Sequence, residues 1–223
     1  MKIQRTHILF LVNLLFIILP ASFITTTGQR IIVSDKDSEQ TFENQNGIIS
    51  GTLVFNEIRL SSIKSSTDDY VGISIPFFES HSTPGDPNLP VYNQLAELAS
   101  DDSYLFEVIE IDSIQIDLNS YYGESKVVPG TPSLKRNHKK AGIAYKKNPN
   151  VYKLDADFHL PLLSLEKEGR LRGVNLGRII VSPVKYNPVK NTLTLFTSIK
   201  FVCKPESETY QKRTELRSRV FEH

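Results

Sequence analysis

One cysteine and five histidines are the residues of this chain whose types could carry nucleophilic or metal chemistry. Cys203 is a candidate protease nucleophile, because a thiolate activated by a histidine can attack a peptide carbonyl. The neighbouring sequence argues against this role, because Cys203 continues a period-2 series of residues that face the core of a predicted strand. The series consists of Leu193, Leu195, Thr197, Ile199 and Phe201. A buried cysteine behaves as a small, unreactive hydrophobic side chain, so an active peptidase would require Cys203 to be exposed.

The histidines and the paired acids show no pattern of a metal site. No two histidines have the spacing of metal ligands, and no second cysteine supports a zinc site. The histidines are His7, His81, His138, His159 and His223. Asp68-Asp69 and Asp101-Asp102 occur in polar loops, where acids are usually solvated turn residues rather than a catalytic dyad. No loop has the alternating carboxylates of a calcium site, so we expect no metal and no other cofactor.

A cluster of basic residues is the sharpest chemical feature of the chain. It occupies residues 135–147, a stretch without any acid, inside a longer segment, 121–150, that is rich in proline and glycine. Its members are Lys135, Arg136, Lys139, Lys140, Lys146 and Lys147. The composition predicts an exposed, extended loop. From its composition the loop is expected to be a solvated loop or a protease-sensitive linker.

The N-terminus has the layout of a secretory signal peptide. Lys2 and Arg5 precede an apolar stretch, residues 8–20, and small and polar residues follow it. Thr26 and Gly28 place small residues where a signal peptidase needs them, which predicts cleavage after Gly28. The apolar stretch is shorter than the roughly 20 residues that span a bilayer, so a retained membrane anchor is the less favoured alternative.

The charge of the exported part gives no reason to expect a nucleic-acid partner. Residues 1–28 hold two of the 26 basic residues and none of the 25 acidic ones, which leaves a net charge of −1 after cleavage. A nearly neutral chain is not drawn to polyanions, so we expect membrane contact only through the signal peptide during export. With one cysteine, no intrachain disulfide can form, and the domain depends on its hydrophobic core.

Short period-2 segments predict the elements that position these residues. The longest predicted strand is 104–118, and further strands are predicted at 31–33, 52–60, 71–75, 178–181 and from 192 onward. The turn-forming residues 186–191 predict a β-hairpin between 178–181 and the strand from 192. Residues 34–46 are expected to be a polar lead-in, and 93–100 are ambiguous between helix and strand.

These elements predict an all-β fold, an antiparallel, jelly-roll-like β-sandwich with a long basic loop. We expect a signal peptide at 1–28, a polar lead-in at 29–50, the β-domain at 51–204 and a charged tail at 205–223.

Two segments of the chain resemble the propeptide of gingipain-type cysteine peptidases. One is Gly85-Asp86-Pro87-Asn88-Leu89-Pro90-Val91, which is similar to the family's Gly-x-Pro-x-Leu-Pro segment. The other runs from Arg172-Gly173 through Ser182-Pro183 to Tyr186-Asn187-Pro188 and the strand after it. The resemblance covers residues 47–204 and implies a β-rich propeptide.

The resemblance implies a non-catalytic domain that assists folding of a peptidase catalytic domain and inhibits it until cleavage. In such zymogens a propeptide loop places a basic side chain in the specificity pocket, where an acid pairs with it. The candidates for this residue are Lys135, Arg136, Lys139 and Lys140. Processing would then occur at basic residues in the tail, with a frayed charged terminus as the alternative. These residues are Lys212, Arg213, Arg217 and Arg219.

The resemblance also implies a bacterial protein that is secreted or held in the cell envelope. No catalytic domain follows the propeptide in this chain, which predicts a truncated gene, a fragment or an inhibitor that acts in trans. The alternative function is a secreted adhesive or carbohydrate-binding β-sandwich module. Its sugar-stacking platform would be thin, because Tyr121 and Tyr122 are the only adjacent tyrosines and the chain has no tryptophan.

Overall fold

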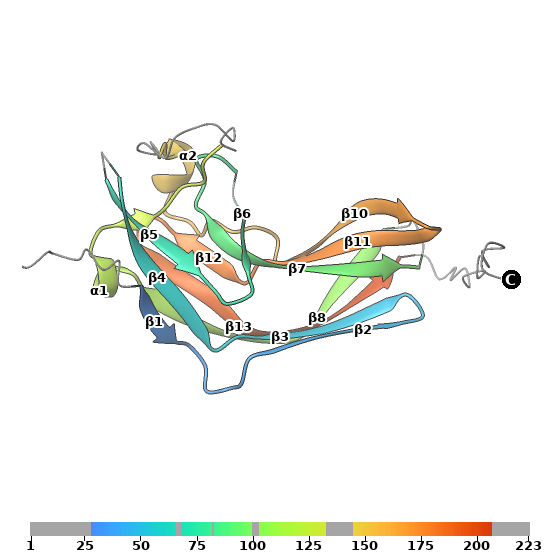
Figure 1. Cartoon of the computed structure of the whole chain (residues 1–223). Helices are drawn as coiled ribbons and strands as arrows, with labels where there is room; N and C mark the ends of the chain where they lie inside the picture. The colour runs from blue at the N-terminus through green and yellow to red at the C-terminus, as the bar shows by residue number, and fades with distance from the viewer. Residues whose placement is uncertain (1–27, 66–67, 82, 100–102, 133–144, 207–223) are drawn as a thin grey trace, which may run out of the picture.

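The protein is a β-structure built from three sheets (Figure 1). The computed structural model describes residues 28–65, 68–81, 83–99, 103–132 and 145–206. Its strands are β1 (Gln29–Ile32), β2 (Glu39–Gln45), β3 (Ile48–Val54), β4 (Glu57–Lys64), β5 (Asp69–Ser74), β6 (Glu79–His81), β7 (Leu89–Leu98), β8 (Tyr104–Asp117), β9 (Lys126–Val127), β10 (Leu163–Leu171), β11 (Val174–Val181), β12 (Val184–Asn187) and β13 (Thr192–Pro205). Two single-turn helices are α1 (Asn119–Tyr122) and α2 (Pro149–Tyr152).

Strand β13 is the central strand of the longest sheet. Its whole length pairs with β8 on one side, while its other side pairs first with β12 and then with β3. Strand β2 pairs with β3 and forms the edge of the sheet. Because β13 runs through both halves of this sheet, it contributes side chains to both halves of the core.

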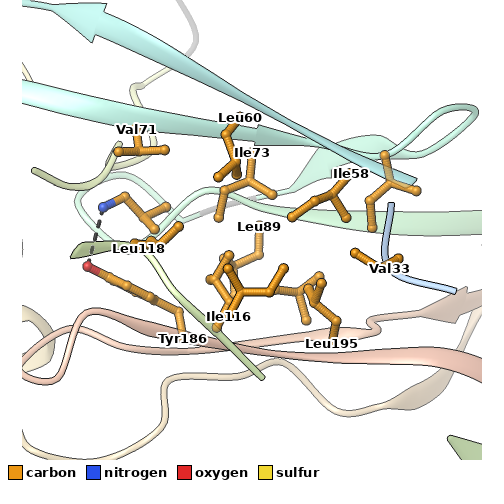
Figure 2. Close-up of a cluster of buried hydrophobic side chains, with 14 of the residues drawn as sticks. Val33, Ile58, Leu60, Val71, Ile73, Leu89, Ile116, Leu118, Tyr186 and Leu195 are labelled. Carbon is orange, nitrogen blue, oxygen red and sulfur yellow. Dashed lines mark hydrogen bonds between the residues drawn. The ribbon is translucent and has the colours of Figure 1, made fainter. Parts of the chain in front are cut away.

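Two smaller sheets cover the two halves of the long sheet, as Figure 1 shows. One has the order β1-β4-β5-β9 and encloses a core with Leu193 and Leu195 of β13. Figure 2 shows this core, in which Leu60, Ile73 and Leu89 face Ile116, Tyr186 and Leu195. The other has the order β10-β11-β7-β6 and covers Ile199, Phe201 and Cys203 of β13. The prediction of an all-β antiparallel sandwich is confirmed, with β5 and β9 as one parallel pair.

The predicted hairpin between 178–181 and 192 onward is wrong in its partner. Residues 178–181 belong to β11, which pairs with β10 and β7 in a covering sheet. The strand that forms the hairpin with β13 is β12, and the turn lies between them as expected. Ser182-Pro183 separates β11 from β12, because proline has no N–H to continue a ladder, and the chain crosses there from one sheet to the other.

The structure also corrects the expectation for residues 34–46 and decides the open one for residues 93–100. The polar segment 34–46 contains β2, which forms a seven-residue ladder with β3. The segment 93–100, which its sequence leaves open between helix and strand, is strand up to Leu98, because 92–98 pair with β11. The long strand at 104–118 is confirmed as β8. Within the described residues, no helix is long and apolar enough to cross a membrane.

Candidate functional site

The described ends of the basic loop lie together at one end of the molecule. The first end is Val128-Pro129-Gly130, which follows β9 and is buried. Its path is fixed because Val128 N–H donates to Val71 O of β5 at 2.9 Å. The second end is 145–148, which leads into α2. Residues 133–144, and with them Lys135, Arg136, Lys139 and Lys140, lie outside the described part of the chain.

Helix α2 anchors the second end of the loop. Asn148 is its N-cap, and the side-chain Oδ1 accepts a hydrogen bond from Asn150 N–H at 3.1 Å. Pro149 suits the first helical position, where its missing N–H leaves no intrahelical bond unmade. Tyr152 donates its hydroxyl to Val127 O at 2.7 Å, so the helix is tied to β9 at the first end of the loop. Burial raises the pKa of the Tyr152 hydroxyl well above its ordinary value, and the group stays a donor at any physiological pH.

Gly85 bonds to both ends of the loop with its own backbone. Its N–H donates to Gly130 O at 2.9 Å, and its carbonyl accepts from Asn148 N–H at 2.8 Å. The residue has a φ of 94°, a conformation that side chains disfavour. A Cβ at this position would also lie 3.3 Å from the backbone oxygen of Lys146. A residue with a side chain would therefore be strained where the two ends of the loop meet.

The residues beside Gly85 extend these contacts. Asp86 O accepts from Gly130 N–H at 2.8 Å, and its carboxylate oxygen Oδ1 accepts from Asn148 Nδ2 at 2.8 Å. Asn88 N–H donates to Val128 O at 2.9 Å. Segment 84–88 thus runs beside 128–130 and is also hydrogen-bonded to residue 148. We call these residues, 84–88 with Gly130 and Asn148, the loop clamp.

Lys147 carries a separate attachment just inside the second end. Its Nζ lies 3.1 Å from Asp68 Oδ2 and 5.6 Å from the centre of the Tyr70 ring. Tyr145 packs on the same ring, with ring centres 5.4 Å apart. The hydrogen bond from Lys147, with a second from the Tyr70 hydroxyl, lowers the pKa of the Asp68 carboxyl. Burial and the bond to Asp68 raise the pKa of Tyr70 to about 12. Lys147 is therefore occupied within the domain, whereas Lys146 is exposed.

The remaining candidates for a chemical role are Cys203, possible metal ligands, Gly28 and the basic residues of the tail. Cys203 is fully buried, and burial raises the pKa of its thiol to about 12, which confirms the inference from the strand pattern. Among the described residues, no group of histidine, cysteine or acidic side chains could hold a metal ion. Gly28, the predicted cleavage position, is exposed directly before β1. The predicted processing residues in the tail, Lys212, Arg213, Arg217 and Arg219, lie outside the described residues.

The sequence alone indicates an ordinary loop at 80–90 and does not reveal the clamp. The positive φ of Gly85 and its closeness to the Lys146 backbone are properties of the folded chain. The sequence does indicate a turn at this place, because Gly-Asp-Pro-Asn combines turn-forming residues directly before the buried residues of β7.

Known proteins share this fold and this sequence pattern. Residues 35–223 match the Propeptide_C25 family model. Lys-gingipain HG66 and Lys-gingipain W83, both from Porphyromonas gingivalis, are 24% identical over 146 residues. That alignment covers 66% of this chain but only 8% of each relative.

Two solved structures have the same architecture. A structure that concerns the zymogenic latency of gingipain K from Porphyromonas gingivalis matches with a TM-score of 0.73 and 21% identity, over 81% of this chain and 100% of that one. The complex of the pro- and mature domains of RgpB from the same organism matches with a TM-score of 0.67 and 17% identity, over 80% and 90%. Since the family model spans most of the chain, the protein belongs to the Propeptide_C25 family, the propeptide domains of gingipain-type cysteine peptidases.

Proposed function

We propose that this domain keeps a gingipain-type cysteine peptidase domain inactive and assists its folding, and that it has no catalytic activity of its own. The observation that carries the proposal is the arrangement of the basic loop in a chain of this family. The two described ends of the loop leave the sandwich at points that are bonded to the same residue, Gly85.

A loop fixed at both ends suits a substrate-like inhibitor. Binding an extended segment costs conformational entropy, and a loop whose ends are already held together loses less of it. The basic residue that enters the specificity pocket is one of Lys135, Arg136, Lys139 and Lys140. Lys147 is a poor candidate, because its ammonium group is already paired with Asp68.

The buried Cys203 supports the view that the peptidase activity belongs to another domain. A thiol with a pKa of about 12 is almost wholly protonated at neutral pH and has no route to a substrate. We also propose export by the signal peptide with cleavage after Gly28, to the cell envelope or the exterior of a bacterium. Release of the peptidase follows cleavage among the basic residues of 205–223.

Inhibition by the purified domain tests this proposal. Residues 29–223 are titrated against an Arg-specific and a Lys-specific gingipain-type peptidase, and the four candidate residues are changed singly to alanine. The matched control is Lys200→Ala, since Lys200 is an exposed lysine of β13. We expect substrate-competitive inhibition of one specificity, a loss of at least about 100-fold in one loop variant, and no effect of the control.

The outcomes separate the roles. Inhibition lost in one loop variant identifies the residue in the pocket, and the peptidase that is inhibited gives the specificity. A well-folded wild-type domain that inhibits neither peptidase would refute the inhibitory role. A refolding assay of the catalytic domain with and without residues 29–223 tests folding assistance independently.

A further inference from the structure

We propose that Phe77 is an aromatic anchor that inserts into an apolar pocket on the surface of the peptidase domain, away from its specificity pocket. The inference rests on the proposed function and names a contact that lies outside the basic loop. The observation behind it is an exposed ring held in a backbone conformation that phenylalanine disfavours.

Phe77 occupies the turn between β5 and β6. The Phe78 N–H donates to Ile75 O at 3.1 Å, which closes a four-residue turn with Pro76 and Phe77 at its centre. Proline fixes its own φ at about −65°, and Phe77 has a φ of 69°, so the turn is of type II. The second central position of such a turn favours glycine or asparagine, and a bulky side chain is strained there.

The strained side chain does not serve the packing of the domain. Phe77 is 82% exposed and belongs to neither core, whereas Ile75 at the start of the turn is buried. Four described residues with a side chain have a positive φ: Asn46, Phe77, Arg172 and Asn191. Asparagine is common in this conformation, and an exposed aromatic residue is not. Exposure and strain both disfavour Phe77 in the isolated domain, and its ring is suited to a contact with another surface.

The turn presents this ring on a rigid support. Pro76 restricts the backbone on one side of Phe77. On the other side, Phe78 packs against both cores, with its ring centre 5.5 Å from that of Phe55 and 5.4 Å from that of Tyr92. A ring held in this way loses little conformational entropy on binding, and buried aromatic anchors carry much of the energy of protein interfaces.

The surroundings of the turn resemble the polar rim of an interface. Ile32 of β1 is exposed and pairs with Glu57 at the start of β4, and the end of β5 pairs with β4 at Arg59. Ile32 and Phe77 therefore lie at the same end of this sheet. On β4, between them, Glu57 forms ion pairs with Arg30 and Arg59, whose side chains stay exposed and leave a surplus positive charge. We expect the partner pocket to be apolar with acidic groups at its rim.

The peptidase domain is the partner within reach of this turn. Strand β6 leads from the turn toward Gly85, whose backbone bonds to both ends of the basic loop. Gly85 follows Phe77 by eight residues, which span at most about 29 Å. This is about the diameter of a small domain. A peptidase domain bound at the loop ends can therefore also cover Phe77.

Variants at Phe77 separate an anchor from a structural residue. Phe77→Ala removes the ring, Phe77→Leu keeps an apolar side chain, and Phe77→Gly removes the ring and also relieves the strain. Leu171→Ala is the matched control, because Leu171 is an exposed apolar residue at the end of β10 in the other covering sheet.

Two measurements are made on each variant of residues 29–223. Urea denaturation gives the stability of the domain alone. Binding is measured to an Arg-specific and a Lys-specific gingipain-type peptidase whose catalytic cysteine is replaced by alanine, so that no peptide bond is cut. Inhibition of the active peptidases is followed in parallel.

We expect Phe77→Ala and Phe77→Gly to raise the Kd for the peptidase about 30-fold, the effect of truncating a hot-spot residue. Phe77→Leu should raise the Kd less, and the control should leave it unchanged. The urea midpoint of Phe77→Gly should equal or exceed that of the wild type, because relief of strain offsets the greater freedom of glycine in the unfolded chain.

Three results would overturn the anchor and leave the proposed function intact. The first is an unchanged Kd in Phe77→Ala while the wild type binds and inhibits. The second is a lower urea midpoint in Phe77→Gly, which would show that the ring stabilises the domain itself. The third is a wild type that self-associates in light scattering where Phe77→Ala does not, which would assign the ring to a second copy of this chain.

Two other results concern the proposed function. A wild type that binds without inhibiting, and loses binding in Phe77→Ala, supports the anchor and refutes the inhibitory role. A wild type that binds neither peptidase overturns both proposals.

Discussion

Asn191 is predicted to be the most costly polar residue to replace in this domain. It is fully buried with a φ of 57° at the end of the turn before β13. Its Oδ1 accepts from the Tyr186 hydroxyl at 2.9 Å. Its Nδ2 lies 3.0 Å from Asn119 Oδ1 and 3.1 Å from the carbonyl oxygens of Gly123 and Ser125. One side chain thus ties the turn to the segment that leads into β9 and the basic loop.

Two substitutions separate the hydrogen bonds from the backbone strain. Asn191→Gly removes the side chain at a φ that glycine adopts freely, and it leaves the buried Tyr186 hydroxyl without its acceptor. We expect a loss of about 3 kcal/mol in the free energy of unfolding. Asn191→Ala loses the same bonds and keeps a Cβ in the left-handed region, which alanine tolerates less well than asparagine or glycine, for about 1 kcal/mol more than Asn191→Gly.

Urea denaturation followed by far-UV circular dichroism measures both variants. With an unchanged m-value, the midpoints should fall in the order wild type, Asn191→Gly, Asn191→Ala. Equal midpoints for the two variants would refute the strain argument. A loss below about 1 kcal/mol in both would show that the buried amide network does not stabilise the fold as its geometry implies.

Two further predictions concern ionisable groups. Cys203, with a pKa of about 12, should react with a thiol reagent at pH ~8 only as fast as the domain opens, and rapid labelling of the folded domain would contradict its burial. Asp68 has a lowered pKa, so its pairing with Lys147 stabilises the folded state fully above the ordinary carboxyl pKa, and this stabilisation is lost as the pH falls through the lowered value. Lys147→Ala should move the Asp68 pKa, measured by carboxyl NMR, back up toward its ordinary value; an unchanged value would show that the ion pair is absent in solution.

Local patterns in the sequence predict those parts of the fold that depend on one strand alone. The alternation in β8 and β13 follows from the pleat of a strand with one buried face, and it also places Cys203 in the core. The partner of a strand is a non-local property, which is why the pattern pairs β11 with β13 instead of β7 and β10. Strand β2 escapes detection because it is an edge strand of mostly exposed polar residues, with Phe42 packed against the core.

The same distinction applies to the candidate site. Composition alone locates the basic cluster, because charge and proline content are visible in any window of sequence. The clamp is built mostly from backbone groups of 84–88, 130 and 148, with one side-chain bond between Asn148 and Asp86, and residue type does not predict which backbone N–H bonds to which carbonyl. Within the predicted turn 186–191, the Oδ1 of Asn187 accepts from the nearby Val189 and Lys190 N–H groups, as turn asparagines do, whereas the side chain of Asn191 bonds to distant segments.

The position of β13 in the chain has a consequence for the order in which the domain folds. This strand pairs with β12, β3 and β8 and supplies side chains to both cores, yet it occupies residues 192–205, after every strand that it joins. A chain that is synthesised from its N-terminus cannot complete either core until these residues have emerged. Strands β3 and β8 must wait unpaired on that side until then, which delays folding. The domain therefore completes both of its cores late, once its C-terminal strand is present.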